Sequence, residues 1–266
     1  MAVAVRRIDA RARALPDFVV IGAQKAGTTT LYAQIVANAS VLPALRKEVH
    51  YFDAAPRPLG WYRAFFPREA RVREVARRTG SVHVGEATPF YLCHPAAPTR
   101  MRAVVPYARL IAILREPVSR AVSGYHHAVR MGDETRAIHV ALDPEHADEL
   151  ATPADTAWYD DPRCPIRRRG YLVRGHYAEQ LARWLAVYPR DQLLVLDTTE
   201  LAGGVAAARA LDFLGVSGTG GAPLPNRNVG HYDAVPDRVR RRLADHFAPH
   251  NARLWELLGE SWEWPA

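Results

Sequence analysis

The sequence predicts an α/β fold of three layers, in which helices cover both faces of a central parallel sheet. Two apolar runs, at residues 18–21 and 110–114, are typical of strands buried on both faces, as the strands of a parallel sheet are. Each run is followed by a segment with the apolar spacing of a helix. At 266 residues and 48% hydrophobic, the chain can bury one sizeable core, so we expect a single domain at 16–266 after an N-terminal tail at 1–15.

The first strand leads into a glycine-bounded loop, Gly22-Ala-Gln-Lys-Ala-Gly27, and then into a helix that begins at Thr28. A tight loop before a helix directs backbone N–H groups and the positive end of the helix dipole at one point. We therefore expect a phosphate there, with a mere connection as the alternative. A Walker A loop has its lysine after the second glycine, whereas Lys25 precedes it here. The expected anion-binding residues are Gln24, Lys25, Ala26, Gly27, Thr28 and Thr29.

The use of lysine singles out two positions. Of the 35 basic residues only Lys25 and Lys47 are lysine, so they are candidates for sites that need a compact ammonium group, unless both survive by chance. The net charge of +7 suits a polyanionic ligand, but it also fits any protein rich in arginine.

The segment at 41–53 carries a carboxylate and an imidazole close to the loop in sequence. Glu48 and His50 alternate with Val49 and Tyr51, so an extended backbone would place both polar groups on one side. Such a pair suits general-base catalysis on a hydroxyl or an amine. The alternative is that Glu48 only pairs with Lys47 at the surface.

Two further segments have both a functional and a structural interpretation. The aromatic segment at 59–67, which includes Trp61, forms either a wall of an acceptor cleft or a hydrophobic cluster under the loop. The alternating segment at 81–91 predicts a strand that runs into a loop, with Glu86 as a second site carboxylate or as a capping group at the strand end.

A second phosphate site is expected after the strand at 110–114. Arg115 follows this strand, Pro117 suits the first turn of a helix, and Ser123 comes one to two turns later. Ligands of open α/β sheets bind beyond the carboxyl ends of the strands, so this arginine and the Lys25 loop should share one edge. A guanidinium group can bind a phosphate with two hydrogen bonds, and a hydroxyl can add a third. The alternative is an ion pair between Arg115 and a neighbour.

The rest of the chain completes the α/β pattern. We expect a variable acceptor-side insertion at 131–170, a buried strand at 192–197, a helix at 199–214 closed by Gly215, and a long final helix at 235–258. The arginines at 167–169 either bind an anionic acceptor or form a solvated surface.

Cysteine usage and hydropathy bear on location and on metals. Cys93 and Cys164 lie far apart without metal-ligand spacing, so we expect both to be reduced. No apolar run approaches the roughly 18 residues of a membrane span, and residues 1–14 lack the apolar core of a signal peptide. We therefore expect a cytoplasmic protein without membrane contacts. We also expect no bound metal, because no metal ligands cluster in the sequence.

The two phosphate motifs resemble those of sulfotransferases that use 3′-phosphoadenosine-5′-phosphosulfate (PAPS). The Lys25 loop is similar to their 5′-phosphosulfate loop, and the 3′-phosphate motif is matched by Arg115, Pro117, Arg120 and Ser123. The resemblance covers roughly residues 16–260 and is nearest to the heparan sulfate N- and 3-O-sulfotransferase type. It implies a fold related to nucleotide kinases, PAPS as cosubstrate and adenosine 3′,5′-bisphosphate as product.

The resemblance also implies a role for individual residues. Glu48 matches the base that takes the proton of the acceptor, and Lys25 would stabilise the leaving phosphate. His127 matches a histidine implicated near the transferring group in the N-sulfotransferase branch, whereas a lone helical histidine is more often structural. Arg227 and Gly230 lie where the family has a loop over the 3′-phosphate, although its lysine-rich form is absent. The acceptor side would include Lys47, His50, Trp61 and Glu86.

Two other classes of protein remain as alternatives. A P-loop kinase or NTPase is disfavoured by the position of Lys25 and by the lack of a clear acidic Mg²⁺ ligand after a strand. A non-catalytic binder of polyanions is disfavoured because the arginines are scattered without an aromatic-interleaved patch. We therefore expect a saccharide or small-molecule acceptor and no nucleic acid; the sequence does not predict the oligomeric state.

Overall fold

A computed structural model describes residues 2–145, 156–216 and 235–264 of the chain, whose centre is a parallel sheet. Five strands pair in the order β2-β3-β1-β4-β5. The sheet predicted from the apolar runs is confirmed. The strands are β1 (Phe18–Gly22), β2 (Val41–Pro43), β3 (His83–Ala87), β4 (Arg109–Leu114) and β5 (Leu193–Asp197).

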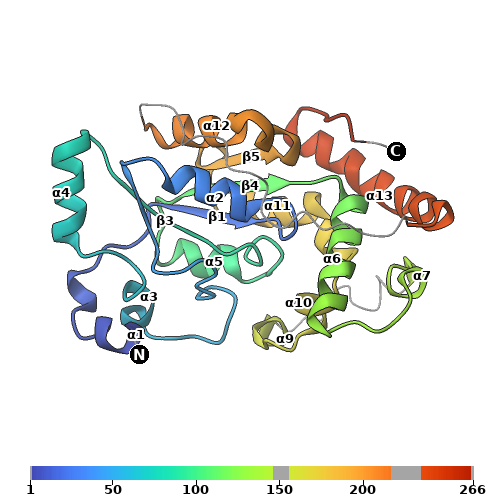
Figure 1. Ribbon diagram of the computed structural model, residues 1–266, viewed down its shortest axis with the longest axis horizontal. Coiled ribbons are helices and arrows are strands. Elements are labelled where there is room, and N and C mark those ends of the chain that lie inside the picture. The colour runs from blue at the N-terminus through green and yellow to red at the C-terminus, as the bar shows by residue number, and fades with distance from the viewer. Residues whose placement is uncertain (1, 146–155, 217–234, 265–266) are drawn as a thin grey trace.

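Helices flank both faces of the sheet, as the three-layer prediction requires. Figure 1 shows α2 and α12 over one face and α5 and α11 over the other, while α6, α7, α9 and α10 gather at one end of the molecule. The helices are α1 (Ala2–Arg6), α2 (Thr28–Val36), α3 (Leu59–Arg63), α4 (Glu69–Thr79), α5 (Ala97–Arg102), α6 (Pro117–Met131), α7 (Ile138–Ala141), α9 (Thr156–Asp160), α10 (Pro165–Arg169), α11 (Tyr177–Leu185), α12 (Val205–Leu214) and α13 (Asp237–Leu258). Short 3₁₀ helices are η1 (Ala10–Ala12), η2 (Val173–Gly175), η3 (Arg190–Gln192) and η4 (Thr198–Gly204).

The core of the sheet is built on β1, all of whose residues are buried. It pairs with β3 on one side and β4 on the other, so that Phe18 lies opposite Gly85. A Cβ atom at Gly85 would lie 2.0 Å from the ring of Phe18, so the centre of the sheet needs a glycine at this position. The connection that leaves β1 runs towards the β2 edge of the sheet and the one that leaves β4 runs towards the β5 edge. This divergence opens the crevice where α/β folds bind ligands, at the carboxyl ends of β1 and β4.

Two arginines of the N-terminal segment contact the domain. Arg13 is only 6% exposed and donates a hydrogen bond to the carbonyl oxygen of Phe66 at 2.9 Å. Arg6 donates to the carbonyl oxygens of Ala64 and Phe66, both at 2.6 Å. Arginines that look like surface charges in the sequence therefore bind main-chain oxygens of the domain, so part of the segment predicted as a tail at 1–15 packs against it.

The single helix expected at 199–214 is broken. The segment begins as η4, and α12 starts only at Val205. Gly203 and Gly204 adopt left-handed φ values of 70° and 79°, which interrupt the helical hydrogen bonds, and Gly215 ends α12 as predicted.

Cys93 and Cys164 are free and buried, as expected. Among the described helices, none has the length and apolar character needed to cross a membrane.

Candidate active site

The loop after β1 has the geometry of an anion-binding site. Gly27 adopts φ 87° at the start of α2, where a Cβ atom would lie 2.3 Å from Leu201, so only glycine fits. Within the described part of the chain no side chain caps α2, so the N–H groups of Thr28 and Thr29 can serve an incoming anion. Lys25 also has a left-handed φ of 70°, an unfavourable conformation for a residue with a Cβ.

The loop meets the end of β4, as the sequence predicts. The N–H group of Ala23 donates to the carbonyl oxygen of Ile113 at 2.7 Å, and Arg115 Nη1 lies 3.4 Å from the carbonyl oxygen of Lys25. The hydroxyl of Thr198 connects both segments, through the carbonyl oxygens of Ala26 and Leu114 at 3.0 and 2.6 Å. Lys25 and Arg115, which are far apart in sequence, therefore lie at the same edge of the sheet.

The helix after Arg115 begins at Pro117 as expected, and Glu116 caps it by accepting hydrogen bonds from the N–H groups of Val118 and Ser119. Ser123 lies on α6 and is 6% exposed. Arg120 is fully buried and donates to the carbonyl oxygen of Tyr171. Arg120, which belongs to the predicted 3′-phosphate motif, therefore holds the segment after α10 against α6.

The segment that carries Glu48 is not extended, contrary to the prediction. Glu48 and His50 have left-handed φ values of 63° and 56°. The reason is that the backbone follows the end of β3: the N–H group of Glu48 donates to Ala87 and that of Val49 to the hydroxyl of Thr88. The two side chains still meet, with His50 Nε2 3.5 Å from Glu48 Oε2.

Strained backbone marks the predicted site. Lys25, Glu48 and His50 are the non-glycine residues with positive φ in the described ranges. Such conformations cost of order 1 kcal/mol each and are concentrated at functional sites. Strain therefore coincides with three of the site candidates predicted from the sequence.

Charged neighbours set the protonation of this segment. The hydrogen bond from His50 and the positive charge of Lys47, whose Nζ lies 3.1 Å from Glu48 Oε1, lower the pKa of Glu48 to about 2. Burial lowers the pKa of His50, but its hydrogen bonds to Asp53 and Glu48 outweigh burial and raise it to about 9. At neutral pH the site therefore holds an ionised carboxylate beside a charged imidazole.

Asp53 and Arg167 support this imidazole, and no local pattern in the sequence identifies either residue. Asp53 is fully buried, with Oδ2 2.7 Å from His50 Nδ1 and 3.0 Å from Arg167 Nη1. Arg167 also lies over the ring of Phe90, with Cζ 4.0 Å from its centroid. Within the run at 167–169 nothing in the sequence distinguishes Arg167, whose partner lies 114 residues away.

The charge on His50 predicts a pH dependence of stability. The folded pKa of about 9 exceeds the reference value of 6.5, so the charged imidazole stabilises the fold fully below pH 6.5, and this contribution is lost as the pH rises through 9. We expect urea unfolding to show that the free energy of unfolding falls by about 1 kcal/mol over this pH range, a figure that allows for solvent screening. The His50→Gln variant should not show this fall. Parallel curves for both proteins between pH 6.5 and 9 would contradict this.

Glu86 is fully buried, and the structure gives it no surface that an acceptor could contact. Its carboxylate accepts hydrogen bonds from the hydroxyls of Tyr62, Thr88 and Tyr91, at 2.6, 2.7 and 3.3 Å. Thr88 and Tyr91 in turn accept the N–H groups of Val49 and Tyr51, which flank His50. The hydrogen bonds of Glu86 therefore suit a residue that positions the Glu48 segment, and not the contact with the acceptor that the sequence predicts. Burial raises the pKa of Glu86 to about 7.

Replacing Glu86 with alanine is expected to lower the free energy of unfolding by about 3 kcal/mol, because three buried hydroxyls lose their acceptor. Chemical denaturation measures the change. The matched control is Glu256→Ala, which removes an exposed carboxylate of α13 and should leave stability unchanged. Equal stability of the two variants would contradict the positioning role.

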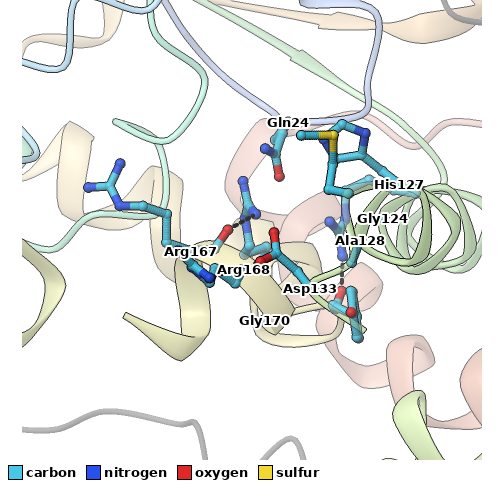
Figure 2. Close-up of a pocket in the computed structure, with 12 residues that line it drawn as sticks. Gln24, Gly124, His127, Ala128, Asp133, Arg167, Arg168 and Gly170 are labelled. Atoms are coloured by element: carbon cyan, nitrogen blue, oxygen red, sulfur yellow. Dashed lines mark hydrogen bonds and ion pairs between the residues drawn. The ribbon is translucent and has the colours of Figure 1, made fainter. Parts of the chain in front are cut away.

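A pocket of about 200 Å³ joins the loop after β1 to α6 and α10. Figure 2 shows Gln24 and His127 on its upper side, with Arg168 and Asp133 below them. Arg168 Nη1 lies 2.8 Å from Asp133 Oδ1. Burial and the positive charge of Lys25 lower the pKa of His127, so its imidazole is neutral at pH 7. The lining also includes Arg167 and the buried Arg174. A pocket lined by several arginines suits a ligand that carries an anionic group.

The aromatic segment at 59–67 is largely a hydrophobic cluster. Tyr62, Phe65 and Phe66 are buried in the core, in agreement with the structural interpretation. Trp61 is half-buried and is covered by Arg57, whose Cζ lies 4.3 Å from its ring centroid, so its acceptor contact stays a prediction. Arg227 and Gly230 lie outside the described residues.

The chain belongs to the family of the sulfotransferase domain, whose model matches residues 15–226. It is accordingly a sulfotransferase, as the two phosphate motifs predicted.

Relatives and a solved structure agree with this assignment. The chain is 28% identical over 280 residues to heparan sulfate glucosamine 3-O-sulfotransferase 6 of Homo sapiens, over 95% of this chain and 74% of the relative. It is 34% identical over 200 residues to the bifunctional heparan sulfate N-deacetylase/N-sulfotransferase of Drosophila melanogaster, over 70% of this chain but 18% of the relative. The crystal structure of a sulfotransferase from Alicyclobacillus acidocaldarius is 29% identical, with a TM-score of 0.68, and the match covers 94% of this chain and 98% of that one.

Proposed function

We propose that this enzyme transfers the sulfuryl group of PAPS to a hydroxyl or an amine of a carbohydrate and releases adenosine 3′,5′-bisphosphate. The observation that carries the proposal is the contact between the Lys25 loop and Arg115 at one edge of the sheet, where Arg115 Nη1 lies 3.4 Å from the carbonyl oxygen of Lys25. A nucleotide with phosphates on both sides of its ribose needs two such cationic groups close together. The carbohydrate acceptor rests on the names of the heparan sulfate relatives. A secondary metabolite is the other acceptor class that this chemistry admits.

In this proposal the loop binds the 5′-phosphosulfate. The N–H groups of Gly27, Thr28 and Thr29, the hydroxyls of the two threonines and the dipole of α2 hold the anion, as at other helix N-termini. The N–H group of Ala26 instead closes the loop by donating to the carbonyl oxygen of Ala23 at 3.2 Å. Lys25 neutralises the charge that grows on the oxygen between sulfur and the 5′-phosphate. Arg115 and Ser123 bind the 3′-phosphate, with Arg227 and Gly230 as further candidates.

Glu48 accepts the proton of the acceptor as its oxygen or nitrogen attacks sulfur and the bond to the 5′-phosphate oxygen breaks. Its ionised state, maintained by His50 and Lys47, is the form that a base requires. A carboxylate with a pKa of about 2 is a weak base, so proton transfer should occur only once the new bond to sulfur makes the acceptor strongly acidic. His127, neutral and beside Lys25, stabilises charge on the transferring group.

Replacing Arg115 with alanine is expected to weaken binding of adenosine 3′,5′-bisphosphate 10- to 100-fold, since a charge-assisted bidentate contact is lost. Adenosine 5′-phosphate, which has no 3′-phosphate, should bind equally well to both proteins. Isothermal titration calorimetry measures both ligands, with the exposed Arg71→Ala as control. An equal loss for the two nucleotides would argue against the assignment of Arg115 to the 3′-phosphate.

The proposed function is tested with radiolabelled PAPS and a panel of acceptors: desulfated heparan saccharides with free hydroxyls or amines, other sugars, and phenolic or lipid alcohols. We expect label on a saccharide, and thermal stabilisation by adenosine 3′,5′-bisphosphate but not by ATP with Mg²⁺. Stabilisation by ATP with Mg²⁺ alone would favour a nucleotide kinase. The cytoplasmic location stays a prediction, which cell fractionation tests.

A further inference from the structure

Three histidines come together away from the residues assigned to catalysis. His176 lies at the start of α11, and His246 and His250 lie one turn apart on α13. Their candidate ligand nitrogens all lie within 4.8 Å of one another, and all three side chains are partly exposed. The sequence predicts no cluster of metal ligands, because His176 is 70 residues from His246. Only the spacing of His246 and His250, which puts both on one helix face, could be read from the sequence.

The spacing of the nitrogens suits one metal ion. His176 Nε2 lies 2.9 Å from His246 Nε2. Two imidazoles bound to one ion at about 2.0–2.1 Å, with an angle near 90–110° between them, place their nitrogens roughly 3 Å apart. The rings of His176 and His250 are parallel, with centroids 3.7 Å apart. Because the three candidate nitrogens lie within 4.8 Å of one another, the side chains need to draw together around a shared ion.

A carboxylate next to the cluster supplies a second, independent observation. Glu179 on α11 places Oε1 3.1 Å from His250 Nδ1, and its buried Oε2 has no hydrogen-bond partner among the residues that the structure describes. A carboxylate that accepts the Nδ1–H of a histidine leaves Nε2 as the ligating atom and is a common support of metal-bound imidazoles. Arg253 Nη2 lies 3.0 Å from the same Oε1 and 2.8 Å from His250 Nδ1. The exposed arginine must therefore release Nδ1 when this nitrogen donates to Glu179.

We propose that His176, His246 and His250 bind one divalent transition-metal ion, with zinc as the expected occupant and water in the fourth position. Three neutral imidazoles and an open position form a zinc site, and imidazole also binds nickel and copper. The ion would join α11 to α13. Tyr177, next to His176, donates its hydroxyl to the carbonyl oxygen of Arg115 at 2.9 Å, so the ion also steadies the residue proposed for the 3′-phosphate.

The test uses the untagged full-length chain after removal of metals with EDTA. We expect calorimetry to give one zinc per chain and the unfolding temperature to rise by about 5 °C at 100 times the dissociation constant. His246→Gln and His250→Gln should lose the bound zinc and the rise. The matched control, His139→Gln on the exposed face of α7, should keep both.

Cobalt supplies a readout that needs no variant. Three imidazoles and a water should give Co²⁺ the intense visible absorption of a tetrahedral ion, in place of the pale spectrum of the aqueous ion. The proposal is overturned if the wild-type chain binds no zinc, if the two variants bind it as well as His139→Gln does, or if cobalt keeps its aqueous spectrum. Sulfuryl transfer does not enter these measurements, so they are independent of the proposed function.

Discussion

The Lys25→Ala variant is expected to lose activity by 100- to 1000-fold in kcat, the size of effect seen when one preorganised donor to a developing charge is removed. The ammonium group is proposed to neutralise the oxygen that separates from sulfur, and this charge is largest in the transition state. KM for PAPS should change less than kcat. Initial rates with radiolabelled PAPS measure both.

Two controls separate charge from backbone strain at this position. Lys25 has a φ of 70°, which alanine tolerates no better than lysine but glycine adopts freely. Lys25→Gly should therefore be at least as stable as the wild type and still be as inactive as Lys25→Ala. Lys25→Arg keeps the charge on a planar group and should retain intermediate activity. Normal turnover by Lys25→Ala would remove the loop from the mechanism.

Replacing Glu48 with glutamine is expected to lower kcat by about 100- to 10 000-fold, the usual contribution of a general base. Glutamine keeps the size of the side chain and can still accept a hydrogen bond from Lys47, but it cannot take a proton. Binding of adenosine 3′,5′-bisphosphate should be unchanged, which calorimetry checks on the same preparation. Lys47→Ala, which removes only the neighbouring cation, is the milder control. Undiminished turnover by Glu48→Gln would contradict the assignment.

The features that could be predicted from the sequence are those that local patterns determine. The apolar runs of β1 and β4 indicate buried parallel strands, and the glycine-bounded loop before Thr28 and the proline at 117 indicate where helices begin. The position of Arg115 relative to the loop follows from the general rule for α/β sheets. These parts of the prediction needed no knowledge of long-range contacts.

The features that could not be predicted depend on partners far apart in the chain. Arg167 reaches Asp53, which orients His50, and Tyr62 reaches Glu86 from a separate segment. No periodicity identifies such pairs. The backbone of Glu48 could not be read from alternation either, since its hydrogen bond to Ala87 imposes a left-handed turn where the pattern indicates an extended chain.

A crystal structure with adenosine 3′,5′-bisphosphate tests the central claim most directly. We expect the 5′-phosphate on the N–H groups of the loop within hydrogen-bonding distance of Lys25 Nζ, and the 3′-phosphate on the Arg115 guanidinium and the Ser123 hydroxyl. A nucleotide bound at another edge of the sheet, or one whose two phosphates contact neither Lys25 nor Arg115, would contradict the account.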